Sequence, residues 1–238
     1  MRKVLFTMLL VATSTSICAQ QDWADFRKYE ASNAEYRAQP NDGQRIVFFG
    51  NSITENWGRM RPEFFSQNGY ICRGISGQTS YQFLVRFRED VVSLRPKVVV
   101  INAGTNDIAE NNHRYVEDRT LGNIISMCEI AKANKIKVIL TTVTPCGRYS
   151  WKTDITNVPA KIESLNARIR DYADKHKIPF IDYYTPMVVK EGVKKGYMYE
   201  ELTQDGCHPT EAGYTIMEPL AKAVVEKCAG RKSKNNSK

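Results

Sequence analysis

Short apolar runs alternate with longer amphipathic stretches along most of the chain. The apolar runs are residues 45–49, 70–73, 97–102, 137–143 and 179–182. Helical spacing of apolar residues recurs at about 57–67, 78–93, 115–134 and 158–176, and a last stretch runs from about Pro209 to Cys228. A polar stretch with scattered aromatic residues, 22–38, predicts a peripheral N-terminal helix. The alternation predicts strands and helices in turn.

Val and Ile dominate the runs 97–102 and 137–143, and neither run alternates apolar with polar residues. Strands covered on both faces have this pattern, which favours a parallel sheet. Five such strands separated by helices predict a doubly wound α/β domain with helices on both faces of a five-stranded parallel sheet.

Glycine and small polar residues follow each of the first four predicted strands. They are Gly50-Asn51-Ser52, Gly74-Ile75-Ser76-Gly77, Ala103-Gly104-Thr105-Asn106-Asp107 and Thr144-Pro145-Cys146-Gly147. In open α/β sheets, ligands bind outside the carboxyl ends of the strands. The sequence therefore predicts a site at this edge, where backbone N–H groups can approach a ligand closely.

The first 19 residues have the pattern of a secretory signal peptide. Arg2 and Lys3 precede an apolar run, residues 4–12, and small polar residues lead to Cys18-Ala19. We expect cleavage after Ala19 and an exported, periplasmic or extracellular protein. A lipid-modified Cys18 is the alternative, which the large Ile17 disfavours. The apolar run is too short for a membrane anchor, and no other run is long enough to span a bilayer.

The formal charge of +8 overstates the charge of the predicted domain, residues 20–230. Removing Arg2 and Lys3 leaves +6, and the four basic residues of the tail 231–238 account for four more, which leaves about +2. We expect that tail to be disordered. Because the charge lies mostly in the two ends, we predict no nucleic-acid partner.

Five cysteines remain after signal removal, namely Cys72, Cys128, Cys146, Cys207 and Cys228. An odd number in an exported protein implies at least one free thiol or an intermolecular bridge. None of them form Cys-x-x-Cys pairs, which disfavours zinc and thioredoxin-like sites. We predict that no metal or organic cofactor is needed. No Gly-x-Gly-x-x-Gly or Walker pattern follows a strand, which disfavours a nucleotide-binding protein.

A serine hydrolase needs a base, a carboxylate that orients it, and donors for the oxyanion. The chain has three histidines: His113 in a polar loop, His176 at the charged end of a helix, and His208 three residues after Asp205. The Asp-x-x-His turn can place a carboxylate against one imidazole nitrogen, although it can also be a simple helix entry. Ser52 and Asn106 can likewise be helix caps. Their common position after strands favours the catalytic interpretation.

Four short motifs occur in a fixed order: "GNSI" at 50–53, the glycine of "GISGQTS" at 77, "GTND" at 104–107 and "DGCHP" at 205–209. They resemble the four sequence blocks of the SGNH hydrolases, the GDSL-type esterases and lipases. The resemblance extends from about residue 45 to 228, and in size the chain is similar to single-domain members that resemble platelet-activating-factor acetylhydrolase subunits. It implies a flavodoxin-like three-layer α/β/α sandwich.

The resemblance also implies roles for individual residues. Ser52 would be the nucleophile, His208 the base and then the acid, and Asp205 the residue that orients His208. The N–H groups of Ser52 and Gly77 and the side chain of Asn106 would form the oxyanion hole. Asn51 and Ile53 stand where the family name has aspartate and leucine, but neither position has a role in the triad. Cys207 suggests a thiol nucleophile, but it shares its turn with His208 and has no separate base.

The substrate is less clearly encoded. Tyr149 and Trp151 lie among polar residues in the segment 144–157, where they can stack on sugars or anchor the loop. Trp57 can line the pocket or pack in the core. Together with export, this polar aromatic rim favours a secreted esterase that removes short acyl groups, above all acetyl, from a soluble glycan. The alternatives are a lysophospholipase or arylesterase acting on small esters, and a non-catalytic glycan-binding protein on the same fold.

Overall fold

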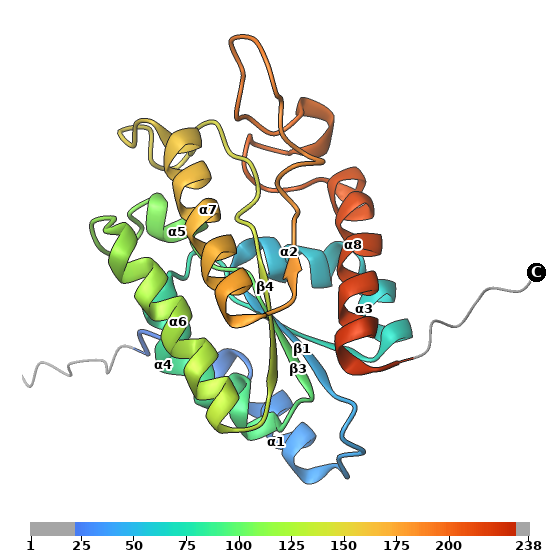
Figure 1. The fold of residues 1–238 in the computed structure, drawn as a ribbon. Helices are drawn as coiled ribbons and strands as arrows, with labels where there is room; N and C mark the ends of the chain where they lie inside the picture. The colour runs from blue at the N-terminus through green and yellow to red at the C-terminus, as the bar shows by residue number, and fades with distance from the viewer. Residues whose placement is uncertain (1–21, 232–238) are drawn as a thin grey trace, which may run out of the picture.

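A parallel five-stranded sheet forms the centre of the protein (Figure 1). A computed structural model describes residues 22–231. The strands are β1 (Ile46–Gly50), β2 (Tyr70–Gly74), β3 (Val98–Ile101), β4 (Lys137–Thr141) and β5 (Phe180–Ile181), in the spatial order β2-β1-β3-β4-β5. All five predicted strands are present. The predicted signal peptide, residues 1–19, lies outside the described residues.

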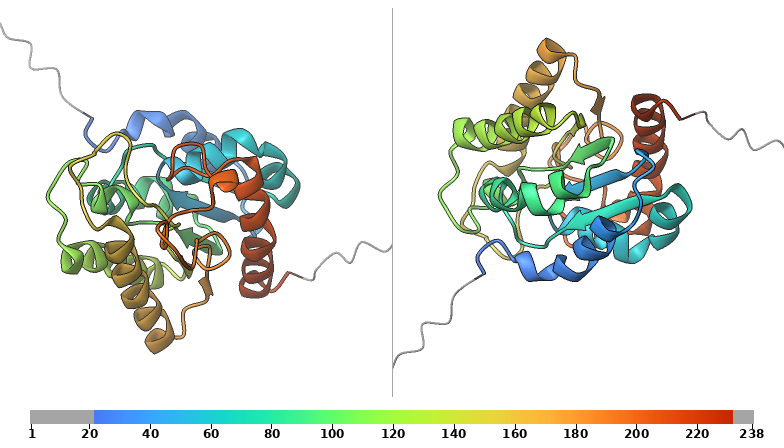
Figure 2. Two further views of the ribbon diagram at one scale, coloured as in Figure 1. Left: turned by 90° about the horizontal axis from the view of Figure 1, so that it is seen from above. Right: turned by 90° about the horizontal axis from the view of Figure 1, so that it is seen from below.

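Helices cover both faces of this sheet, as Figures 1 and 2 show. One layer holds α4 (Ser80–Asp90), α6 (Glu117–Ala133) and α7 (Val158–His176), and the other holds α2 (Ser52–Met60), α3 (Pro62–Asn68) and α8 (Glu211–Ala229). Successive strand residues point to opposite faces, so that Val47 and Phe49 pack in the first layer's core while Ile46 and Phe48 pack in the second. The predicted three-layer α/β/α sandwich is confirmed.

The strand order places a topological switch between β1 and β3. The chain passes from β1 to β2 on one side, and then returns to β3 on the other side of β1. Ligands of open α/β sheets bind at the carboxyl ends of the strands next to such a switch. Ser52 follows β1 directly, and the short helix α5 (Thr105–Ile108) with Asn106 follows β3.

Three helical segments differ from the prediction. The expected N-terminal helix 22–38 is a short turn, η1 (Phe26–Lys28), and then α1 (Glu30–Ala38). The expected helix 57–67 is two helices, because α2 starts at Ser52 and α3 starts at Pro62, which fits a first helical turn but breaks a helix interior. The four-residue helix α5 was not predicted, since it has no apolar period to detect.

The first residue of the predicted tail 231–238 is held by the domain. Arg231 donates hydrogen bonds to the carbonyl oxygens of Asn68 (2.8 Å) and Gln44 (2.6 Å). Its guanidinium also lies 6.0 Å from the centre of the Tyr70 ring. Arg231 is therefore part of the folded domain, and residues 232–238 lie outside the described part of the chain.

A buried arginine of α4 connects the carboxyl ends of β1 and β2. Arg86 donates to the carbonyl oxygens of Gly50 (2.9 Å) and Arg73 (3.1 Å) and to the side-chain oxygen of Gln78 (2.5 Å). Its charge is balanced by Asp90, one turn later, at 2.7 Å, and both side chains are almost fully buried. The guanidinium fork therefore holds the ends of two strands and the loop after β2 in one fixed arrangement.

We predict that Arg86→Met lowers the free energy of unfolding by about 3–5 kcal/mol, because it removes the cation that is hydrogen-bonded to the buried Asp90 carboxylate. The double variant Arg86→Met/Asp90→Leu should lose less than the single variant, since the buried carboxylate is removed together with its hydrogen-bonded cation. Chemical denaturation of the purified proteins measures both differences.

Arg88→Met, on the exposed side of the same helix, is the matched control and should remain within about 0.5 kcal/mol of the parent. A single variant Arg86→Met as stable as this control would contradict the central role of the buried guanidinium.

Candidate active site

Ser52 lies at the start of α2, immediately after β1. The side chain of Asn51 caps the helix by accepting a hydrogen bond from the N–H of Ile53 (2.9 Å). Ser52 is buried to 6% exposure, and its N–H is among the first of the helix, which have no partner within the helix. The serine hydroxyl and an unused backbone donor therefore lie together at the carboxyl edge of the sheet.

The glycine before Asn51 is required by close packing. A Cβ atom at Gly50 would lie 2.1 Å from the hydroxyl oxygen of Thr54 and 3.2 Å from the carbonyl oxygen of Asn102. Any side chain here would push α2 away from the end of β1. Gly50 thus lets the helix begin directly above the strand, which fixes the position of Ser52.

Asp205 and His208 lie in the turn that leads into α8. One carboxylate oxygen of Asp205 accepts hydrogen bonds from the backbone N–H groups of Cys207 (3.0 Å) and His208 (2.8 Å). The carbonyl oxygen of His208 accepts from the backbone of Gln204 (2.9 Å) and the hydroxyl of Thr203 (3.0 Å). The turn is therefore held by its own hydrogen bonds, and α8 starts at Glu211 with Thr210 as its cap rather than at Pro209.

The structure brings these two segments together. Ser52 Oγ lies 2.8 Å from His208 Nε2, although the two residues are 156 positions apart in the sequence. His208 Nδ1 lies 2.8 Å from the second carboxylate oxygen of Asp205. Because an ionised carboxylate only accepts hydrogen bonds, Nδ1 carries the proton and Nε2 is free to accept the serine hydroxyl proton.

The charge state of Asp205 is set by opposing effects. Burial disfavours its ionised form, but hydrogen bonds from the backbone and ring of His208 outweigh burial, so that the pKa of Asp205 is lowered. The carboxylate is ionised at neutral pH and can stabilise a positive charge on His208.

The two further candidates for the oxyanion hole lie on the neighbouring loops. Gly77 follows β2 with a φ of +76°, which favours glycine. The Asn106 side chain donates one N–H to the carbonyl oxygen of Gln78 (2.9 Å) and has a second N–H available. That carbonyl belongs to the residue after Gly77, so Asn106 also links the loops after β2 and β3.

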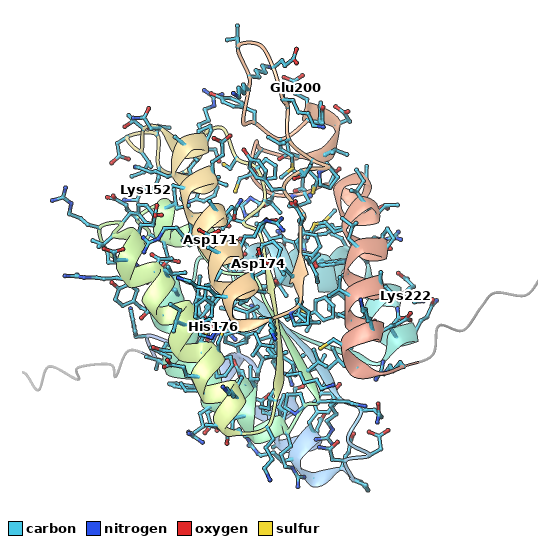
Figure 3. All side chains as sticks on the ribbon, in the orientation of Figure 1. Lys152, Asp171, Asp174, His176, Glu200 and Lys222 are labelled. Atoms are coloured by element: carbon cyan, nitrogen blue, oxygen red, sulfur yellow. The ribbon has the colours of Figure 1, made fainter. Side chains whose placement is uncertain are left out.

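The other two histidines lie outside this hydrogen-bonded group. Nε2 of His113 is 3.5 Å from the buried carboxylate of Asp107, and this polar contact raises the pKa of His113 against the effect of burial. His176 ends α7, where it packs against Tyr172 with ring centres 4.3 Å apart; Figure 3 labels it on that helix.

Only one of the three aromatic candidates for substrate binding is exposed. Trp57 is 2% exposed and stacks between Phe64 and Tyr214, so it is a core residue and not a wall of the pocket. Tyr149 is fully buried and supports Trp151 from behind, with ring centres 5.1 Å apart. Trp151 is 39% exposed and lies 5.4 Å from the ring of His208.

The residue that holds Trp151 could not be predicted from the sequence. The indole N–H of Trp151 donates to the side chain of Asn111 (2.9 Å), in the loop after α5. Asn111 is one of two adjacent asparagines in a polar loop, and nothing in that short pattern distinguishes the residue that reaches the site from its neighbour.

Cys207 does not have the environment of a reactive thiol. It is fully buried, and hydrogen bonding to Cys146 together with burial raises the pKa of its thiol well above the ordinary value. A nucleophilic cysteine requires the opposite shift, because the thiolate is the reactive form. All five cysteines within residues 22–231 are unpaired.

Residues 22–231 contain no group of three or more His, Cys, Asp or Glu side chains arranged to hold a metal ion. Within this range, none of the helices combines the length and the apolar character that crossing a bilayer requires.

Known proteins share this fold and these segments. The sequence profile of the GDSL-like lipase/acylhydrolase family matches residues 48–216. The chain is 57% identical to a GDSL-like lipase of Bacteroides thetaiotaomicron, whose crystal structure superposes with a TM-score of 0.83 and covers 87% of this chain and 99% of the other.

Two curated acetylxylan esterases are more distant. The enzyme of Geobacillus stearothermophilus is 25% identical, over 77% of this chain and 93% of its own length. That of Xylanibacter ruminicola is 23% identical, over 79% of this chain. The chain spans less than half the length of two of its curated relatives: 44% of the Xylanibacter enzyme and 40% of an N-acylneuraminate cytidylyltransferase of Escherichia coli.

The family profile covers well over half of the chain and includes both the segment of Ser52 and the turn of Asp205 and His208. The sandwich fold and the blocks in the sequence agree with this match. The chain therefore belongs to the GDSL-like lipase/acylhydrolase family, which places the domain among the carboxylic ester hydrolases.

Proposed function

We propose that this protein is an exported serine esterase that removes short acyl groups, mainly acetyl, from carbohydrates. The observation that carries the mechanism is the continuous hydrogen-bonded chain from Ser52 through His208 to Asp205, with both links at 2.8 Å. This is the arrangement that serine acyl transfer requires, with a nucleophile, a base and a group that orients the base.

In the first step, His208 removes the hydroxyl proton of Ser52 through Nε2 while Ser52 Oγ attacks the ester carbonyl carbon. The imidazolium that forms is stabilised by the ionised Asp205, which also keeps the ring in the tautomer that accepts at Nε2. The hydrogen bond that is already present means that little reorganisation is needed for this transfer.

The carbonyl oxygen becomes negatively charged in the tetrahedral intermediate. Three donors can meet it: the N–H groups of Ser52 and Gly77 and the unused N–H of the Asn106 side chain. Donors held in place by the fold stabilise this negative charge more than water molecules do, because they require no reorientation as the charge develops. Removing one such donor typically costs about 3–4 kcal/mol of transition-state stabilisation.

The alcohol then leaves with the proton held by His208, and an acyl group remains on Ser52. Water enters, gives a proton to the same imidazole and attacks the acyl carbonyl, which releases the acid and restores the serine hydroxyl. Each of the two half-reactions uses the same base and the same donors.

The exposed face of Trp151 beside His208 supports a carbohydrate substrate, because an aromatic face next to polar groups suits the stacking of a sugar ring. The acetylxylan esterases among the relatives support the same class of substrate, although their identity to this chain is low. Export rests on the sequence of residues 1–19 and is part of the proposal.

We expect Ser52→Ala to lower kcat for p-nitrophenyl acetate by on the order of 10⁵–10⁶-fold, because no other group can form the acyl-enzyme. The thermal unfolding midpoint should change little. Ser164→Ala, on the exposed face of α7, is the control and should hydrolyse the ester at the parent rate. Substantial turnover by a folded Ser52→Ala protein would remove Ser52 as the nucleophile.

Asp205→Asn should lower kcat by about 10³–10⁴-fold. An asparagine can still accept from the backbone N–H groups of Cys207 and His208, but its amide then donates to His208 Nδ1. The imidazole proton must move to Nε2, which can no longer accept from Ser52. Steady-state kinetics against the exposed Asp174→Asn on α7 measures the effect, and equal rates for the two variants would argue against the orienting role of Asp205.

A series of p-nitrophenyl esters tests the acyl group, and acetylated xylan tests the alcohol. We expect the highest kcat/KM with acetate, because a pocket made for a short acyl group rejects added methylenes, and a maximum beyond about eight carbons would contradict the proposal and favour a lysophospholipase. Release of acetate from xylan, with Ser52→Ala as the blank, is the direct measurement. Hydrolysis of the aryl ester without any release from acetylated glycans would contradict the carbohydrate substrate.

A further inference from the structure

The side chain of Asn111 joins loops that follow three different strands. Its Nδ2 donates to the carbonyl oxygen of Gly77 (3.0 Å), in the loop after β2. Its Oδ1 accepts from the indole N–H of Trp151 (2.9 Å), in the loop after β4. Its backbone N–H donates to the carbonyl oxygen of Asn106 (3.1 Å), which follows β3. The residue therefore contacts the oxyanion candidates and the exposed tryptophan at the same time.

The bond to Gly77 acts on a residue in the left-handed backbone region. Gly77 has a φ of +76°. Among residues 22–231, its two chain neighbours apart, the side-chain nitrogen of Asn111 is the only atom within 4 Å of the position that a Cβ would take, at 3.9 Å. Little else packs against this glycine from that side. The hydrogen bond to its carbonyl oxygen thus restricts a residue that has access to many other conformations.

The bond to the indole sets the orientation of an exposed ring. The rings of Trp151 and His208 are 5.4 Å apart at their centres and inclined by 38°. Tyr149 supports Trp151 from the buried side, and the indole N–H is held at the edge by Asn111. An exposed side chain fixed at two points loses less conformational freedom when it contacts a substrate.

We propose that Asn111 is a positioning residue with two separable effects: it fixes the Gly77 backbone for oxyanion binding, and it holds Trp151 as a platform for the alcohol part of the ester, a sugar ring. The proposal rests on the function proposed above. A carboxamide suits both tasks, because it donates through nitrogen and accepts through oxygen, whereas a carboxylate can only accept. The two effects can therefore be removed one at a time.

Two substrates distinguish the effects. Methyl acetate has an alcohol too small to use the Trp151 platform, whereas acetylated xylo-oligosaccharides need both parts of the site. Asn111→Asp keeps the acceptor for the indole and loses the donor to Gly77, so kcat should fall about twofold to tenfold with both substrates while KM for the saccharide is retained. Trp151→Phe loses the indole N–H and should raise KM for the saccharide more than KM for methyl acetate.

Asn111→Ala loses both bonds, and should lower kcat and raise the saccharide KM together. Adding Trp151→Phe to Asn111→Ala should then raise the saccharide KM no further than the larger of the two single effects, because both changes break the same hydrogen bond. If Asn111→Ala does not fold, Asn111→Asp and Trp151→Phe carry the test alone. Asn112→Ala, the neighbouring exposed residue, whose side chain bonds to Gln82 and Thr79, is the matched control.

Kinetic constants of the Asn111 variants equal to those of Asn112→Ala would overturn the inference, as would fully additive effects of Asn111→Ala and Trp151→Phe on KM. A fall in thermal stability with unchanged kcat and KM would assign Asn111 a purely structural role and also overturn it. If the parent hydrolyses neither ester, or Ser52→Ala retains activity, the proposed function itself has failed. An active parent and an inactive Ser52→Ala, with Asn111 variants like the control, would refute only the role of Asn111.

Discussion

The carboxyl edge of the sheet depends on one buried cation, the guanidinium of Arg86. It holds the carbonyl oxygens at the ends of β1 and β2, and its charge is balanced by a single buried carboxylate, Asp90. One of these carbonyls belongs to Gly50, two residues before Ser52. Arg86 also donates to the side chain of Gln78, whose backbone carbonyl oxygen accepts a hydrogen bond from Asn106. The same side chain therefore sets the distance between Ser52 and the loops after β2 and β3, which a core of purely apolar contacts would define less sharply.

His208 reaches Ser52 by a different route, through the packing of α8 on α2. The turn of Asp205 is closed by its own hydrogen bonds, and its Cys207 side chain is fully buried. It is placed by the helix behind it, where the hydroxyl of Tyr214 donates to the carbonyl oxygen of Ile53 (2.8 Å) and Glu218 pairs with Arg61. A local turn thus supplies the geometry of the Asp205–His208 pair, and tertiary packing supplies its position relative to Ser52.

The sequence predicted the sheet, its order of elements along the chain, and the residues that meet at its edge, because each depends on short-range patterns. Strand runs, a glycine where α2 approaches β1, and an Asp-x-x-His turn can all be recognised within a few residues. Arg86, Trp57 and Asn111 could not be assigned in this way. An arginine on an amphipathic helix predicts a solvated charge, and a tryptophan one turn into a helix can face either way. Which of two adjacent asparagines turns inward depends on the loops that it meets, and these come from distant parts of the chain.

The residues of the site come from two groups of segments. The serine and the oxyanion candidates follow β1, β2 and β3, next to the topological switch. Buried polar side chains such as Arg86 hold the ends of these strands in place. Trp151 and the pair of Asp205 and His208 come from the longer segments after β4 and β5, which lie at the same end of the molecule (Figure 1). A change in the segment after β4 can alter the surface offered to the alcohol without disturbing Gly50 or Arg86. Besides the Ser52–His208 hydrogen bond, Asn111 links these two parts through its bonds to Gly77 and Trp151, so in its proposed role a change at the surface for the alcohol would reach the oxyanion loop through this side chain.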